Sequence, residues 1–322
     1  MTFDQILGHD RQKEILSRSL ASGRLAHAYL FSGPDGVGKR LMALALARAI
    51  VCHEQRGCGN CLACRKIDHQ NHPDLHLLEP DGNSIKIEQV RSFQKDLHLK
   101  PLEASRKICL IEEADSMTIG AANALLKTLE EPRGDTLLIL LTAHPNRLLE
   151  TIRSRCQPLP FARHPNSRIQ AQLEKQLDID STESHVLAAL SEGSFKKAFG
   201  KDRELYLDER RKLLKTLTGL SPGSILPILD FAEQISADKT VLPDILEIFQ
   251  AFYRDVMMVL QGRGDNHLVN LDLKEKIHRV SGRENIASIL AKLEALIEVR
   301  RQLDRKVNRQ LAMEELLLKL AA

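Results

Sequence analysis

Apolar and polar positions follow two different periods along this chain, and the change between them divides it into two parts. In the first part, short apolar segments alternate with stretches that have the period of amphipathic helices. We expect strands over residues 28–31, 75–78, 107–111, 136–142 and 157–161. A continuous apolar run such as 136–142 is typical of a parallel strand buried on both faces. The alternation predicts an α/β fold with a parallel sheet.

The second part shows only the helical period. Beyond residue 162 we expect three short helices over 166–178, 181–192 and 194–200. Longer amphipathic helices are expected over 205–218, 223–236, 240–261, 284–302 and 308–320, with a loop at 262–266. The pattern predicts an α/β domain over 1–162, a three-helix domain over 163–204 and an all-α domain over 205–322.

A glycine-rich turn lies between the first expected strand and the helix after it. Residues 33–40 read GPDGVGKR and contain the G-x-x-x-x-G-K pattern of the phosphate-binding P-loop. Gly33, Gly36 and Gly38 let backbone N–H groups turn toward an anion, and the helix N-terminus adds its positive dipole. Lys39 is placed to reach the β- and γ-phosphates of a nucleotide. This context favours a nucleotide-binding fold over a plain glycine turn.

Two positions depart from a P-loop that uses Mg²⁺. Arg40 stands where a working P-loop has a Ser or Thr whose hydroxyl binds the metal, and arginine has no acceptor atom. The strand over 107–111 ends in Glu112 and Glu113, as a Walker B strand ends in Asp and Glu, so the first acid is one methylene longer. ATP or ADP stays open as a ligand, and the two substitutions argue against Mg²⁺.

Four of the six cysteines lie close together, at Cys52, Cys58, Cys61 and Cys64. Their spacing is close to the C-x₂-C knuckle of structural zinc sites. Four thiolates close a tetrahedral shell and leave no open position for catalysis, so we expect a structural zinc ion. His53 is an alternative fourth ligand. Four reduced thiols without metal, or a C-x-x-C redox pair, are the alternatives to zinc.

Composition excludes several classes of function. The net charge is only +3, and aromatic residues are few with no Trp, which argues against a strongly basic nucleic-acid surface and against base-stacking platforms. No segment approaches 18 uncharged apolar residues, so we expect no membrane span. The N-terminus lacks the basic and apolar parts of a signal peptide, and we expect a cytoplasmic protein.

Several motifs occur together: HAYLF at 27–31, the cysteine cluster, HPDL at 72–75, NALLKTLEEP at 123–132 and SRC at 154–156. With the P-loop, their order and spacing resemble the bacterial sliding-clamp loaders of the AAA+ class across the first 160 residues or so. The last two motifs are highly specific as a pair. The resemblance implies an AAA+ P-loop domain with a parallel sheet and a zinc module, a helical lid domain and an all-α collar domain.

The resemblance also implies roles for individual residues. Arg155 corresponds to an arginine finger, which reaches into the ATP site of a neighbouring motor subunit and stabilises charge on the transferred phosphoryl group. Thr142 resembles the sensor-one position, and Glu113 the second acid of Walker B. Lys196, within GSFKKA at 193–198, stands at the sensor-two position, where the family's motor subunits carry Arg.

Because Arg40, Glu112 and Lys196 all depart from the motor pattern, the resemblance implies a stator subunit with weak or no ATP hydrolysis. Its partners would be the delta and gamma/tau subunits of a DNA polymerase III clamp loader, which places a sliding clamp on primed DNA. The alternative is an active ATPase motor of the gamma/tau type, in which Lys39 and Glu113 still act. Direct DNA contacts and the order of subunits in a ring stay open.

Overall fold

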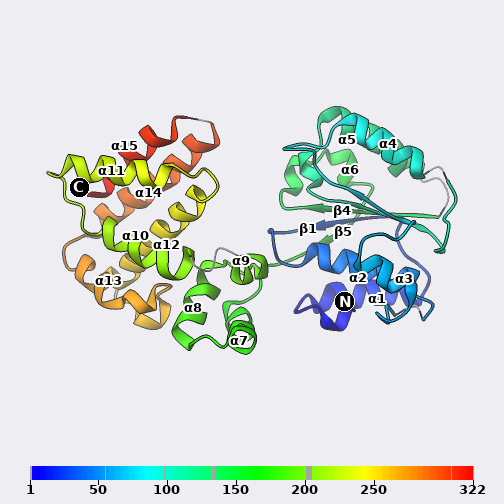
Figure 1. Cartoon of the computed structure of the whole chain (residues 1–322), viewed down its shortest axis with the longest axis horizontal. Helices are drawn as coiled ribbons and strands as arrows, with labels where there is room; N and C mark the ends of the chain where they lie inside the picture. Colours follow the sequence, from blue (N-terminus) through cyan, green and yellow to red (C-terminus); the bar gives the residue numbers. More distant parts are fainter. Residues whose placement is uncertain are drawn as a thin grey trace. The chain divides into compact units, whose positions relative to one another are not determined.

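The computed structural model describes residues 2–54, 56–97, 99–131, 135–200, 205–305 and 307–321. The chain forms two compact units, Met1–His164 and Pro165–Ala322, and each has its own hydrophobic core (Figure 1). Pro132, the last residue of the 123–132 motif, lies outside the described residues, as do residues 201–204 at the expected lid–collar boundary. In the described ranges, no helix is both long enough and apolar enough to cross a bilayer.

A five-stranded parallel sheet forms the centre of the first unit (Figure 1). Its strands are β1 (Ala28–Ser32), β2 (Leu75–Leu78), β3 (Lys107–Ile111), β4 (Thr136–Thr142) and β5 (Gln157–Pro160). They lie in the order β2-β3-β4-β1-β5. Every residue of β3 and β4 is buried, which explains their continuous apolar runs. The α/β fold with a parallel sheet that the sequence predicts is confirmed.

Helices cover both faces of this sheet. They are α1 (Asp10–Ala21), α2 (Lys39–Val51), α3 (Leu62–Asp68), α4 (Ile87–Leu97), α5 (Ile119–Glu130) and α6 (Glu150–Arg153). Tyr29 and Phe31 of β1 pack into one core with residues of α1, α2 and α3. Leu30, between them, packs into a second core with residues of α4, α5 and α6. Successive strand residues point to opposite faces, so one strand serves both cores and the unit has three layers.

A buried carboxylate in the HPDL motif holds the loop before β3. Asp74 is fully buried, and its oxygens accept hydrogen bonds from the backbone N–H groups of Leu102, Glu103 and Ala104 at 2.7–2.8 Å. Burial opposes ionisation, but these donors outweigh it and lower the pKa of Asp74. The side chain of His72 accepts from the N–H of Asp74 and fixes the turn. The motif is therefore a loop anchor.

The second unit is entirely helical in the described residues. Its α-helices are α7 (Asn166–Leu177), α8 (Ser181–Leu190), α9 (Phe195–Phe199), α10 (Arg210–Leu217), α11 (Ile225–Ser236), α12 (Leu242–Leu260), α13 (Lys274–Ser281), α14 (Ile286–Asp304) and α15 (Arg309–Ala321). The sequence pattern missed α13, which is only eight residues long and mostly polar, with Ile277 as its one buried residue. The expected helix over 205–218 begins with a π-helical turn, Leu205–Glu209.

One hydrophobic core runs through this second unit. It joins Ile169 and Val186, from the expected lid region, with Phe249 and Leu316, from the expected collar region. The three-domain division therefore stays a prediction, and the observed division into compact units falls at residues 164 and 165.

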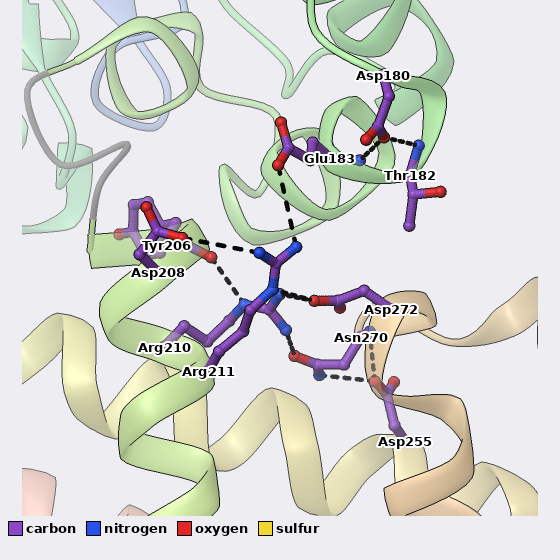
Figure 2. A network of polar contacts seen from close by, with 10 residues as sticks. All are labelled: Asp180, Thr182, Glu183, Tyr206, Asp208, Arg210, Arg211, Asp255, Asn270 and Asp272. Atoms are coloured by element: carbon purple, nitrogen blue, oxygen red, sulfur yellow. Dashed lines mark hydrogen bonds and ion pairs between the residues drawn. The ribbon is translucent and has the colours of Figure 1, made fainter.

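A network of buried charges crosses the helices of the second unit (Figure 2). Arg210 of α10 is completely buried and donates to Asp272 and to the side-chain oxygen of Asn270, both at 2.6 Å. Asn270 in turn donates to Asp255 of α12 through both its backbone N–H and its side chain, each at 2.7 Å. Burying a charge is costly unless it is paired and hydrogen-bonded. These contacts therefore fix α10, α12 and the segment before α13 relative to one another.

The network also reaches α8. Arg211 donates to Asp272 at 3.0 Å and lies 4.0 Å from Glu183 of α8 (Figure 2). His185 of α8 contacts the carbonyl oxygen of Leu268 at 2.8 Å. The second expected lid helix is therefore fastened by polar contacts to the segment before α13.

Replacement of Asp272 tests this network. We expect Asp272→Ala to lower the free energy of unfolding by about 3 kcal/mol, because it leaves the buried Arg210 without its carboxylate. As a control, Asp208→Ala removes an exposed carboxylate 3.7 Å from Arg211 and should cost about 0.5 kcal/mol or less. Urea unfolding followed by circular dichroism measures both. Equal losses in the two variants would contradict a structural role for the buried pair.

The anchor at Asp74 predicts a pH-dependent effect. Because the pKa of Asp74 is lower in the folded protein, its ionised form contributes stability above the ordinary value of 3.8, and this contribution is lost as the pH falls further. We expect Asp74→Asn to cost about 1–3 kcal/mol at neutral pH and less at pH 3. Denaturant unfolding at the two pH values gives the difference. Asp81→Asn, which removes an exposed carboxylate paired with Lys86, is the control and should cost less than about 1 kcal/mol at neutral pH.

Candidate functional site

The P-loop connects β1 to α2 at the carboxyl edge of the sheet. Gly33, Gly36 and Gly38 all have positive φ, at 152°, 73° and 107°. A Cβ at Gly33 would overlap the carbonyl oxygen of Phe161, so this position requires glycine. The glycines of the motif therefore have the backbone role that the sequence predicts for them.

Lys39 points back into the loop. It is only 8% exposed, and its ammonium donates to the carbonyl oxygens of Gly33 and Pro34, the latter at 2.7 Å. Burial lowers the pKa of Lys39, while Asp35, 3.5 Å away, partly opposes this. A bound phosphate would therefore have to replace the loop's own carbonyl oxygens as the partner of the Lys39 ammonium.

Arg40, the second residue of α2, bonds to the acid after β3. Its Nε donates to Glu112, and its Nη2 donates to the side chain of Gln70 at 3.0 Å and lies 3.6 Å from Glu79. Mg²⁺ needs oxygen ligands in near-octahedral geometry. Arg40 offers none, and the Glu112 carboxylate is already paired with a cation. These residues do not fit a Mg²⁺ ion.

The other two residues predicted near the nucleotide follow β3 and β4. Thr142 is buried, and its hydroxyl donates to Asp115 at 2.5 Å. Its carbonyl oxygen accepts from the N–H of Gly33 at 3.1 Å, so it lies beside the P-loop as expected. Glu113 is exposed and has a left-handed backbone, with φ 44°. Asp115 was missed as a partner of Thr142, although it lies in the acidic run that the sequence draws attention to.

Two histidines that the sequence does not single out hold the P-loop from outside. The Nε2 atoms of His9 and His164 lie 2.7 and 3.0 Å from the carbonyl oxygen of Val37. Their rings are 4.6 Å apart, and His9 also packs on Phe161. Burial lowers the pKa of His9, which favours neutral imidazole there. No sequence motif marks this contact, because it joins segments far apart in the chain.

Arg155 lies away from this P-loop. It follows α6 and comes two residues before Gln157, which pairs with Tyr29 in β1, whereas the P-loop follows Ser32 at the other end of that strand. Its guanidinium donates to the Thr151 carbonyl oxygen at 3.0 Å and pairs with Glu130 of α5 at 2.8 Å. The side chain is 36% exposed.

Lys196 is the predicted residue of the second unit. It lies on α9 and is exposed. Its neighbour Lys197 instead bonds to Glu247 of α12 at 2.7 Å, which fastens α9 within that unit.

The four cysteines predicted as zinc ligands come together between α2 and α3. The sulfur atoms of Cys52, Cys58, Cys61 and Cys64 all lie within 4.8 Å of one another. A tetrahedral zinc ion with Zn–S bonds of about 2.3 Å needs sulfur atoms about 3.8 Å apart, and Cys58 and Cys64 are 4.0 Å apart. His53 is exposed and outside this group. The arrangement fits a closed four-thiolate site with Cys52 as fourth ligand.

The surroundings of the cysteines favour a thiolate at Cys52. Burial opposes ionisation, but hydrogen bonds from the backbone N–H groups of Cys58 and Glu54 outweigh it and lower the pKa of Cys52 to about 6. Burial raises the pKa of Cys64 to about 12. A metal ion binds thiolates, so zinc would displace the Cys64 proton.

A buried arginine of α2 packs against the loop that carries the cysteines. Arg48 of α2 is 3% exposed and pairs with Asp68 of α3. A Cβ at Gly57 would lie 3.3 Å from the Arg48 side chain, and Gly57 has φ +70°. The loop can therefore pass this closely over the arginine only with glycine at that position.

Comparison with known proteins gives the family. Residues 8–165 match the family model described as DNA polymerase III, delta subunit, and residues 204–322 match the model of its C-terminal part. The chain is 35% identical to DNA polymerase III subunit delta' of Bacillus subtilis (strain 168), over 96% of this chain and 95% of that protein. It is 32% identical to subunit delta' of Pseudomonas aeruginosa, over 97% and 96% of the two chains.

Two further matches are weaker, one because it covers only part of the two chains and the other because the two folds superpose less well. DNA polymerase III subunit tau of Escherichia coli (strain K12) is 35% identical over 61% of this chain and 32% of its own length. Among solved structures, a DNA polymerase III gamma subunit-related protein of Thermotoga maritima aligns over 95% of this chain and 98% of its own, with a TM-score of 0.45 and 17% identity.

The parallel sheet, the P-loop after β1 and the paired acids after β3 define a P-loop protein of the AAA+ type whose metal-binding positions are altered. The family matches and the near full-length likeness to the Bacillus protein then specify it further. The chain belongs to the delta-prime family of DNA polymerase III subunits. The resemblance to the clamp loaders is thereby confirmed.

The cysteine cluster predicts one zinc ion per chain. We expect Cys64→Ser to lose most of the bound zinc and to lower the melting temperature, because the binding energy of a structural zinc ion is also folding energy. Metal analysis and thermal melting with and without a chelator measure the two effects. Cys109→Ala, at a buried thiol in the core outside the cluster, should keep its zinc. Equal zinc content in both variants would rule out the four-thiolate site.

Proposed function

We propose that this chain is a stator subunit of a bacterial clamp loader, which supplies Arg155 as an arginine finger to a neighbouring subunit and hydrolyses little or no ATP itself. The observation that carries this proposal is the place of Arg155. The residue lies at the opposite end of β1 and β5 from the chain's own P-loop, and its side chain is partly exposed. This position supports a role at another chain's nucleotide over a role at the chain's own P-loop.

The contacts of Arg155 permit this action. An exposed ion pair such as Arg155–Glu130 contributes only about 0–1 kcal/mol, so the guanidinium can leave Glu130 for a more strongly charged phosphate at low cost. Its planar fork of donors suits phosphate oxygens, and such a finger raises phosphoryl-transfer rates by about 10³–10⁵. Glu130 would then hold the side chain until a neighbouring nucleotide replaces it.

The chain's own P-loop supports the second half of the proposal. A metal ion that bridges the β- and γ-phosphates is central to hydrolysis in P-loop enzymes. Here Arg40 and Glu112 are bonded to each other, and the Thr142 hydroxyl is bonded to Asp115. The alternative of an active motor depends on Lys39 and Glu113, and it predicts ATP turnover by the isolated chain that Lys39→Ala abolishes.

The partners follow from the family. As a delta-prime-type subunit, the chain would assemble with delta and gamma/tau subunits and act on the sliding clamp and primed DNA through that complex, in the bacterial cytoplasm. The single core and the buried Arg210–Asp272 pair make the second unit a firm body for such an assembly. Zinc would stabilise the α2–α3 connection, and ATP or ADP remains a candidate ligand of the P-loop.

Replacement of Arg155 tests the proposed function. In a clamp loader assembled with delta and gamma/tau, we expect Arg155→Ala to slow clamp loading and DNA-stimulated ATP hydrolysis at least about tenfold, because the transition state at the neighbouring site loses its guanidinium. Arg155→Lys should not restore the rate, since an ammonium cannot reproduce the planar fork.

Arg147→Ala, at an exposed arginine just before α6, is the matched control and should stay within about twofold of the wild type. Subunit assembly is measured by size-exclusion chromatography in every case. Full activity of an assembled Arg155→Ala complex would refute the arginine finger.

A further inference from the structure

The two residues that depart from the motor pattern at the metal position are in direct contact. Arg40 lies in the first turn of α2, and Glu112 follows the end of β3, 72 positions later. The Arg40 Nε donates to the Glu112 carboxylate. The side chains are 38% and 21% exposed, so the pair is partly shielded from water.

These are the same two positions that hold the metal ion in a hydrolysing P-loop protein. There, the hydroxyl of the residue after the P-loop lysine and an acid at the end of the Walker B strand hold Mg²⁺. We infer that the Arg40–Glu112 ion pair takes the place of the divalent cation in this chain and makes its P-loop indifferent to Mg²⁺. The inference rests on the proposed loss of hydrolysis and supplies a physical cause for it.

The acceptors around Arg40 leave little for a metal ion. Besides Glu112, its guanidinium takes the side-chain oxygen of Gln70 at 3.0 Å and lies 3.6 Å from Glu79. These groups come from the end of β3, the segment after α3 and the segment after β2. A divalent cation would have to displace the Arg40 guanidinium from the Glu112 carboxylate. It would also be repelled by the positive charge of Arg40 at close range.

Glu112, the second departure from the motor pattern, is the hydrogen-bond partner of Arg40, the first. Glutamate is one methylene longer than the aspartate of a Walker B strand, and its length lets the carboxylate reach a guanidinium based on the neighbouring helix α2. Replacing Arg40 alone leaves Glu112 without its partner, and replacing Glu112 alone leaves Arg40 without its bonded carboxylate. Residues in direct contact behave non-additively, so the two positions have to be tested together.

The test compares thermal melting of the full, zinc-loaded chain with ATP, in buffer with Mg²⁺ and in buffer from which divalent cations were removed before the protein was added, so that the zinc ion is left in place. For the wild type we expect the same melting temperature in both, whether ATP itself gives a shift or not. For Arg40→Thr/Glu112→Asp, which restores the hydroxyl and the shorter acid, we expect ATP with Mg²⁺ to raise the melting temperature by about 5 °C over ATP without Mg²⁺. Lys39→Ala in the double variant should abolish this rise, which would locate it at the P-loop.

Two results would overturn the inference: a Mg²⁺-dependent shift in the wild type, or a folded double variant whose melting with ATP ignores Mg²⁺. Circular dichroism checks that the double variant is folded. If it does not fold, Mn²⁺ binding to the wild type with ATP, measured by electron paramagnetic resonance, decides. If the protein binds no more Mn²⁺ than the same ATP solution without protein, the inference is supported. Additional Mn²⁺ bound by the protein in the presence of ATP would contradict it.

This test is separate from that of the arginine finger. Arg155→Ala is measured through the rates of the assembled complex, and the Arg40 and Glu112 variants are measured by melting of the isolated chain. If the Arg155→Ala complex is fully active, the arginine-finger proposal is refuted, but the conclusion from the melting experiment still stands. A Mg²⁺-dependent wild type would leave the finger result intact and would return the chain's own hydrolysis to consideration.

Discussion

The chemistry of the first unit depends on the pairing of three buried parallel strands, β3, β4 and β1. Because parallel strands end at the same edge of a sheet, the residues after them must lie side by side. Glu112 follows β3, Thr142 ends β4, and Gly33 follows β1, so all three meet at one edge although more than 100 residues separate the first glycine from the threonine. The cores on both faces keep this edge fixed.

This scaffold is compatible with hydrolysis and with its loss. The P-loop keeps its positive-φ glycines and its buried lysine, which are backbone and packing requirements of the turn. Its metal position instead holds an ion pair, and the Thr142 hydroxyl is bonded to a carboxylate of the same chain. The turn geometry is therefore kept while the residues at the metal position differ, so the fold by itself does not decide the chemistry.

The remaining polar groups in the interior act as fasteners. Asp74 binds a loop through three backbone N–H groups, Arg210 and Asp272 join segments of the second unit, and Arg48 supports the cysteine loop. Each is a buried or nearly buried charge whose partners compensate for its burial, and loss of those partners would leave the charge uncompensated. Such contacts tie the helices and loops of each unit into one body, which suits the proposed role of a rigid subunit.

The sequence by itself determined the local elements, the P-loop, the cysteine cluster and the family, because these depend on period and spacing within short segments. The helix α13 was missed because it is short and mostly polar. Only the tertiary structure decided that Arg40 bonds to Glu112, that His9 and His164 share the Val37 carbonyl oxygen, and that Asp115 takes the Thr142 hydroxyl. These contacts join segments that are far apart in the sequence and are brought together by the strand order. A pattern of neighbouring residues does not determine that order.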